Sequence, residues 1–183
     1  MTWLKSWARP RSILIFLGVV IACQIGFLVL FQALAAQGVP TTLDMMTGFS
    51  PAQARAHFML YNDQARVILN WFQAVDVVFP VGYGLFFAGF ITWLLMKLMP
   101  AARRLLLLGL VPVTGAVFDL LENTGIFIMV RIYPADINTA AVLTSAAGVV
   151  KNLLFIGSLL FMVVLTVVYI VRRISTKGQP PTG

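Results

Sequence analysis

Two carboxylates lie within a hydrophobic segment that is long enough to cross a membrane. Asp119 and Glu122 are three positions apart between Gly115 and Gly125, and Asn123 follows Glu122 directly. On a helix these three side chains share one face, because positions i, i+3 and i+4 are neighbours. Ionisable groups at membrane depth are energetically costly, so they generally face other protein or a water-filled cavity. The segment therefore predicts a polar centre inside a membrane protein.

Two other hydrophobic segments also contain ionisable side chains, Asp76 in one and Lys151 in the other. Gln73 lies one helical turn before Asp76, and Tyr83 lies seven positions after it, so both return to the side of the helix that carries Asp76. Asn152 follows Lys151 directly. Three separate segments thus offer side chains that could donate, accept or transfer protons.

The composition of the chain requires a membrane class. Of its 183 residues, 60% are hydrophobic and 10% are charged, whereas soluble domains carry about 25% charged residues. The net charge of +7 does not indicate nucleic-acid binding, because the basic residues cluster at the ends of apolar segments. The single cysteine, Cys23, excludes an intrachain disulfide. Internal repeats, nucleotide-binding loops and Cys/His metal spacings are absent from the sequence, and no cofactor is indicated.

We predict an all-α polytopic membrane protein, a single domain over residues 1–183 in which four helices form an antiparallel bundle. The spans are expected at about 13–36, 67–98, 105–130 and 142–171. Ser50-Pro51-Ala52-Gln53 predicts a capping box that starts a short surface helix in the first outer loop. The small residues Gly18, Ala22 and Gly26 predict a packing face within the bundle or across a homodimer.

The first span can also be interpreted as a signal peptide, because Ala33-Leu34-Ala35 fits a cleavage pattern. Its apolar core from Ile13 to Phe31 is longer than the usual signal core of about 7–15 residues, which favours a retained helix. Nine Lys and Arg residues lie at the two termini and in the turn at 97–104, against three at the opposite ends of the spans. The positive-inside rule therefore predicts that both termini are cytoplasmic.

The four ionisable groups are expected at one depth in the outer half of the membrane. At about 1.5 Å per residue, Asp76 and Lys151 lie roughly 12–14 Å below the outer ends of their helices, Glu122 roughly 12 Å and Asp119 roughly 16 Å. Three carboxylates and one lysine leave two negative charges unpaired. At least one carboxylate is then protonated, or a cation, a cationic ligand or water enters the site. A purely structural salt bridge from Lys151 is the alternative.

The leading hypothesis is a polar pocket, opening outward, that binds and could convert a lipid or small amphiphile. Asp76, Asp119 and Glu122 are the candidate catalytic residues, since a protonated and an ionised carboxylate can act as acid and base. The expected ligand-binding residues are Gln73, Tyr83, Asn123, Lys151 and Asn152. No metal site is predicted, because Lys151 repels a cation from the carboxylates. A non-catalytic assembly subunit and a proton-linked carrier are the alternatives, and the sequence does not decide whether the protein is an enzyme.

The pattern Asp76-x-x-Phe79-Pro80-x-x-Tyr83, then Asp119-x-x-Glu122-Asn123, then Lys151 resembles a family of four-span integral membrane proteins of bacteria. The resemblance covers most of the chain. It implies the fold and a location in the bacterial inner (plasma) membrane, and it implies no activity. Membrane lipids are accordingly the expected partners, together with a second copy of the chain.

Overall fold

The computed structural model describes residues 7–177, and within this range every regular element is a helix. For residues 103, 176 and 177 it describes the backbone alone. Lys5 and the side chains of Arg103 and Lys177, which are among the nine basic residues counted above, lie outside the described part. The elements are α2 (Pro10–Ala35), η1 (Leu43–Met45), α3 (Pro51–Phe58), α4 (Asp63–Leu98), η2 (Arg103–Leu110), α5 (Val111–Ile132) and α6 (Asn138–Lys177).

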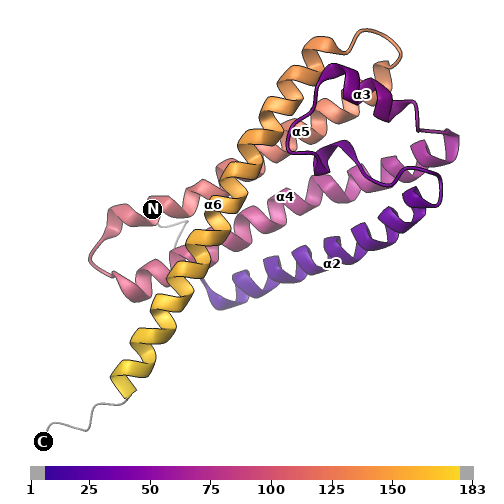
Figure 1. The fold of residues 1–183 in the computed structure, drawn as a ribbon. Coiled ribbons are helices and arrows are strands. Elements are labelled where there is room, and N and C mark those ends of the chain that lie inside the picture. Colours follow the sequence, from indigo (N-terminus) through magenta and orange to yellow (C-terminus); the bar gives the residue numbers. More distant parts are fainter. Residues whose placement is uncertain (1–6, 178–183) are drawn as a thin grey trace, which may run out of the picture.

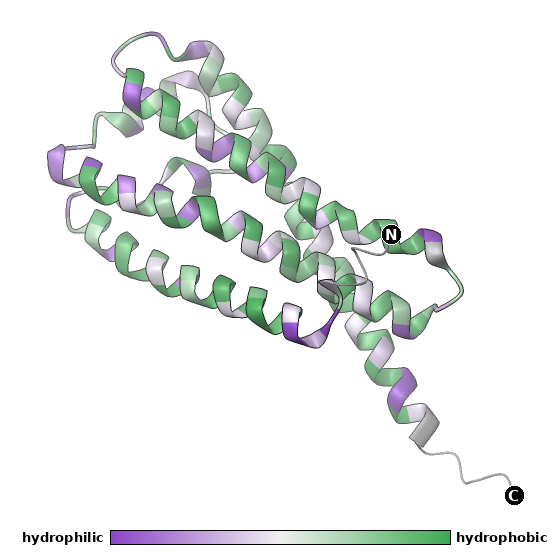
Figure 2. Ribbon diagram, turned by 180° about the vertical axis from the view of Figure 1, so that it is seen from behind, coloured by the Kyte–Doolittle hydropathy of each residue, from purple (hydrophilic) through white to green (hydrophobic). Residues whose placement is uncertain are grey.

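Four of these helical stretches are long and apolar enough to span a membrane, namely α2, α4, η2 with α5, and α6. The predicted class, a four-helix membrane bundle, is confirmed. Figure 2 shows hydrophobic residues along the lengths of the helices and hydrophilic residues gathered mainly toward their ends. The 36 residues of α4 extend over about 54 Å, which exceeds the hydrocarbon thickness of about 30 Å.

Helix α4 is the central element of the bundle. It packs against α2 on one side and against α5 and α6 on the other (Figure 1). The rings of Phe27 and Phe31 on α2 contact Phe72 on α4 at centroid distances of 4.8 and 4.9 Å. At the other end of α4, Trp93 contacts Tyr169 of α6 at 5.3 Å. Aromatic contacts therefore hold α2 and α6 against α4.

The loop between α2 and α4, residues 36–62, folds over one end of the bundle, and we call it the cap (Figure 1). Leu43 and Phe58 of the cap are almost completely buried in the hydrophobic core. Helix α3 within the cap begins with the predicted capping box, in which Ser50 Oγ accepts from Gln53 N and Ser50 N donates to Gln53 Oε1. The short surface helix in the first loop is confirmed.

Two contacts fasten the cap to the segment at the start of α6. Phe49 N donates to Ser145 Oγ at 2.8 Å, and the Arg55 guanidinium pairs with Asp136 at 3.0 Å. Gly48 adopts a φ of 101°, a backbone conformation that favours glycine, where the cap turns toward Ser145. The cap is therefore fastened to the bundle at the start of α6.

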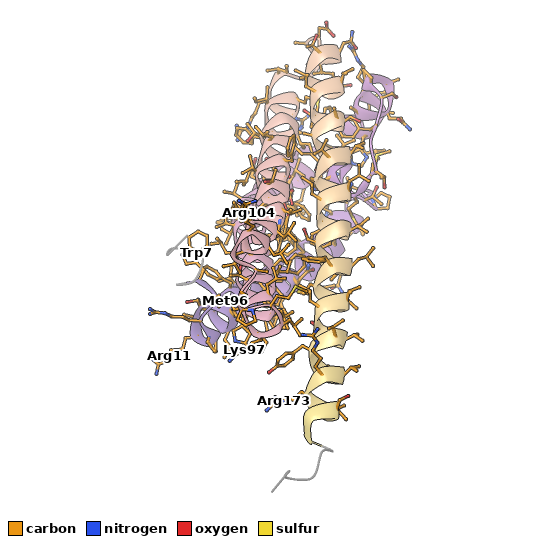
Figure 3. All side chains as sticks on the ribbon, turned by 90° about the vertical axis from the view of Figure 1, so that its left-hand side faces the viewer. Trp7, Arg11, Met96, Lys97, Arg104 and Arg173 are labelled. Carbon is orange, nitrogen blue, oxygen red and sulfur yellow. The ribbon has the colours of Figure 1, made fainter. Side chains whose placement is uncertain are left out.

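The opposite end of the bundle carries basic residues, and we call it the basic end. Figure 3 shows Arg11, Lys97 and Arg173 directed to this end, away from the cap. Arg172 Nη1 donates to the carbonyl of Leu98 at 3.0 Å, which satisfies a carbonyl at the end of α4. Helix α6 therefore contacts the cap at its beginning and α4 at its basic end.

Small residues let the helices approach closely at several crossings. A Cβ added at Gly84 of α4 would lie 2.8 Å from the Cβ of Ala116 on α5. On the predicted packing face of α2, a Cβ added at Gly26 would lie 3.7 Å from the methyl groups of Val75. Gly18 has open space around it. A homodimer through this face stays a prediction.

Candidate functional site

Lys151 binds two carboxylates at once in the interior of the bundle. Its Nζ lies 3.1 Å from Asp119 Oδ1 and 2.5 Å from Glu122 Oε2. The three side chains are nearly inaccessible, at 12%, 6% and 1% exposure. The cluster therefore joins α6 to α5 through a buried ionic contact, as the alternative structural interpretation of Lys151 requires.

Tyr83 completes this network from α4. Its hydroxyl donates to Asp119 Oδ2 at 3.0 Å, so each oxygen of Asp119 receives one donor. The Tyr83 ring is held by Phe79 and Phe155 at centroid distances of 5.3 and 5.1 Å. Both Asp119 oxygens are therefore hydrogen-bonded, whereas Glu122 Oε1 has no hydrogen-bond partner among the described residues. Three helices thus meet at Asp119.

Gly148 makes room for this network. A Cβ atom at position 148 would overlap the carboxylate of Glu122, so only glycine lets that carboxylate lie against α6. One turn earlier on α6, the Thr144 side chain occupies the space that a Cβ atom at Gly125 of α5 would need. The sequence analysis did not identify Gly148, although its position three residues before Lys151 places it on the same helix face.

Asp76 lies outside this network and faces a separate cavity beneath the cap, which we call the polar cavity. Asn123 connects the two regions, because its Nδ2 donates to the backbone carbonyl of Asp76 at 2.9 Å. The polar cavity has a volume of about 10 Å³, which admits about one water-sized particle. Its lining consists of Thr42, Leu43, Asp44, Tyr61, Leu69, Phe72, Gln73, Asp76, Asn123 and Ile126.

A second, larger hollow runs along the membrane-facing side between α4 and α5, and we call it the lateral groove. It encloses about 550 Å³ and is lined by Asn70, Gln73, Ala74, Val77, Asn123, Thr124, Phe127 and Arg131. Gln73 and Asn123 line both the lateral groove and the polar cavity, so these two side chains separate them. Neither lining includes Asp119, Glu122 or Lys151.

The predicted site residues therefore fall into two groups. Asp119, Glu122, Lys151 and Tyr83 form the closed ionic network. Gln73, Asp76 and Asn123 line accessible space at the capped end. Asn152 is half-buried beside Lys151 and takes part in neither group.

Sequence reasoning missed the contributions of the cap to the polar cavity. Thr42, Asp44 and Tyr61 form its roof, and no periodicity in the loop distinguishes them from solvent-exposed residues. Burial, together with the nearby carboxylate of Asp44, raises the pKa of Tyr61 well above its ordinary value. Its hydroxyl therefore stays neutral and can still donate or accept a hydrogen bond.

Within residues 7–177 there is no group of three or more His, Cys, Asp or Glu side chains arranged to hold a metal ion. Lys151 pairs with both Asp119 and Glu122.

Comparison of the chain with protein-family models, with curated proteins and with solved structures finds no match, so the function has to be argued from the geometry alone.

Proposed function

We propose that the protein binds a lipid or similar amphiphile with a negatively charged head in the lateral groove. The observation that carries the proposal is the lining of that groove. Its walls are apolar at Ala74, Val77 and Phe127, and Arg131 is the one charged side chain in the lining. An acyl chain fits the apolar walls, and an anionic head fits the guanidinium.

Arg131 is held at the capped end of the groove. Its guanidinium lies over the ring of Phe127 at 4.9 Å and donates to Asn70 Oδ1 at 3.5 Å. Deeper in the groove, Gln73 Nε2 has no hydrogen-bond partner among the described residues. One donor is thus available about 4–5 Å along α4 from Asn70, the residue that holds Arg131, where the linkage between head and chain of a lipid could be recognised.

The capped end faces outward in this proposal, and both termini are cytoplasmic in the inner membrane of a bacterium. The proposal rests on the positive-inside rule and on the concentration of basic residues at the basic end. The lipid would then belong to the outer leaflet. Binding is the function that the geometry supports, because Asp119 and Glu122 do not reach the groove. Conversion of the lipid would require Asp76 to act across Gln73 and Asn123.

A structural role is favoured for the ionic network itself. Its carboxylates are sealed from both cavities, and Lys151 bridges α5 and α6 through them. Such buried pairs can fix the register of two helices without further activity. The assembly hypothesis therefore applies to this cluster, while the binding hypothesis applies to the lateral groove.

The lateral groove can be blocked without touching the core. Ala74 is exposed on the groove wall, so Ala74→Phe should fill the groove and displace a bound lipid. Ala146→Phe is the matched control, because Ala146 is exposed in a comparable groove of about 490 Å³ between α5 and α6 that contains no charged residue. Lipids that co-purify with each variant would be identified by native mass spectrometry.

We expect the wild type and Ala146→Phe to retain an anionic lipid and Ala74→Phe to lose it. Arg131→Gln should lower the preference for anionic over zwitterionic phospholipid in nanodiscs. An identical set of bound lipids in all four proteins would refute the proposal.

A further inference from the structure

The polar cavity combines negative charge with unused oxygen atoms. Two carboxylates, Asp44 from the cap and Asp76 from α4, line it, and its lining contains no Lys, Arg or His. Thr42 Oγ1, Tyr61 OH and Asn123 Oδ1 are buried and lack hydrogen-bond partners among the described residues. These three residues are only 2%, 6% and 5% exposed, so bulk water does not satisfy them.

Unpartnered polar atoms are rare in protein interiors, because burying a polar group without a hydrogen-bond partner is energetically unfavourable. Here the unpartnered oxygens of the cap and of Asn123 on α5 converge on one small space, which the Asp76 side chain of α4 also lines. Lys151 cannot neutralise Asp76, because its Nζ is taken up by Asp119 and Glu122. The cavity therefore presents an excess of oxygen ligands and an excess of negative charge.

We propose that the polar cavity binds a small monovalent cation, with Na⁺ as the best match. Asp76 and Asp44 supply the charge, and Thr42, Tyr61 and Asn123 supply neutral oxygen ligands. Hard cations prefer oxygen donors, and a volume of about 10 Å³ holds one ion of this size without a water shell. Mg²⁺ fits poorly, since it keeps several of its waters.

Such an ion would join the cap to the transmembrane bundle. Thr42, Asp44 and Tyr61 belong to the cap, whereas Asp76 and Asn123 belong to α4 and α5. Bound Na⁺ would therefore stabilise the closed cap through contacts on both sides. This inference concerns a site on the other side of Gln73 and Asn123 from the lateral groove, and it holds whether or not that groove binds a lipid.

The test is thermal unfolding of the full-length protein in detergent, with NaCl replaced stepwise by choline chloride so that the ionic strength stays constant. The expected result is a saturable rise of the unfolding midpoint with Na⁺. Binding of radioactive ²²Na⁺ to the same samples in a scintillation proximity assay gives a second readout. A parallel series with CaCl₂ distinguishes a monovalent from a divalent site.

Four variants locate the site. Asp76→Asn and Thr42→Val should abolish the response to Na⁺, and Tyr61→Phe should weaken it. Thr92→Val is the matched control for Thr42, because Thr92 is equally buried and its hydroxyl also lacks a partner among the described residues, yet it lies near the basic end of α4, beside Gly109. Thr92→Val should respond to Na⁺ like the wild type.

Three outcomes would overturn the proposal. The first is a wild-type midpoint and ²²Na⁺ signal that do not depend on Na⁺. The second is a response to Ca²⁺ alone, which would assign a divalent site. The third is an unchanged Na⁺ response in Thr42→Val and Tyr61→Phe, two nearly isosteric changes that keep the test valid if Asp76→Asn does not fold.

Discussion

The carboxylate of Glu122 lies against Gly148, in the space that a Cβ atom at position 148 would occupy. This contact lets Glu122 reach Lys151 while remaining completely buried. Gly148→Ala should therefore push the carboxylate away from α6 and destabilise the protein by about 1–3 kcal/mol, the usual cost of overpacking. Thermal unfolding in detergent measures the change.

The matched control is Gly157→Ala on the same helix, where an added Cβ meets open space. Because alanine is the better helix former, this variant should be at least as stable as the wild type. Equal stability of the two alanine variants would contradict the close contact at position 148.

Removing the positive charge from the ionic network should strand its carboxylates. Lys151→Met is expected to lower the free energy of unfolding by about 3–5 kcal/mol, the range for a broken buried pair. Protonation of one of the stranded carboxylates would reduce this loss. Adding Glu122→Gln should restore much of the loss, because one of the two uncompensated carboxylates disappears. The double-mutant series is measured by thermal unfolding, and an additive loss would contradict direct pairing of Lys151 with Glu122.

The small-residue face of α2 can be divided into two parts. Gly26→Leu should lower stability, since the larger side chain would press against Val75. Gly18→Leu meets nothing within the protomer, so it should be tolerated by a monomer. Size-exclusion chromatography with light scattering and thermal unfolding are the measurements. A dimer that Gly18→Leu dissociates would show that this face joins two copies.

The orientation of the bundle can be tested by cysteine labelling in a Cys23→Ala background. A cysteine at Ser50 in the cap should react with a membrane-impermeant reagent added to intact cells. A cysteine at Ala101, in the turn after α4, should react only after the membrane is opened. The reverse pattern would place the capped end in the cytoplasm.

His57 in α3 should make stability depend on pH. Burial lowers its pKa from an ordinary value of 6.5, although Asp44 and a backbone hydrogen bond to Thr41 oppose part of the shift. The unfolded chain then binds a proton at a higher pH than the folded protein does. The contribution of His57 is therefore complete above about pH 6.5 and is lost as the pH falls toward the folded-state pKa.

The measurement compares the unfolding midpoints at about pH 7.5 and about pH 5.5. His57→Phe keeps a ring against Tyr61, which His57 contacts at 5.3 Å, but it cannot titrate. We expect the variant to lose less stability on acidification than the wild type. Equal losses would show that His57 is not the group responsible.

Hydrophobic length and capping chemistry made the fold predictable. Four apolar segments can only satisfy their backbone as helices, and Ser50 with Gln53 marked the start of α3. The constant rise per residue also put Asp119, Glu122 and Lys151 at one depth, and the structure places these three in contact.

The division of the site could not be predicted in the same way. Depth says nothing about the rotation of each helix, so Asp76 was grouped with the other carboxylates, although it lines a different space. The cap carries no periodic pattern that would reveal Thr42 and Asp44 as buried lining. Gly148 could not be recognised from the sequence alone. Glycine is needed at this position because the Glu122 carboxylate of α5 occupies the space of a Cβ atom, and the sequence does not show which side chain of another helix lies there.

The pairing of Lys151 with Asp119 and Glu122 also constrains the order of biosynthesis. Both carboxylates leave the ribosome before the lysine that neutralises them, because α6 is the last helix of the chain. A carboxylate at the centre of a lone inserting helix costs about 2.5–3.5 kcal/mol. Only a short turn joins α5 to α6. The smallest unit that brings both carboxylates into contact with the lysine is therefore the α5–α6 hairpin, which would enter the bilayer as a pair.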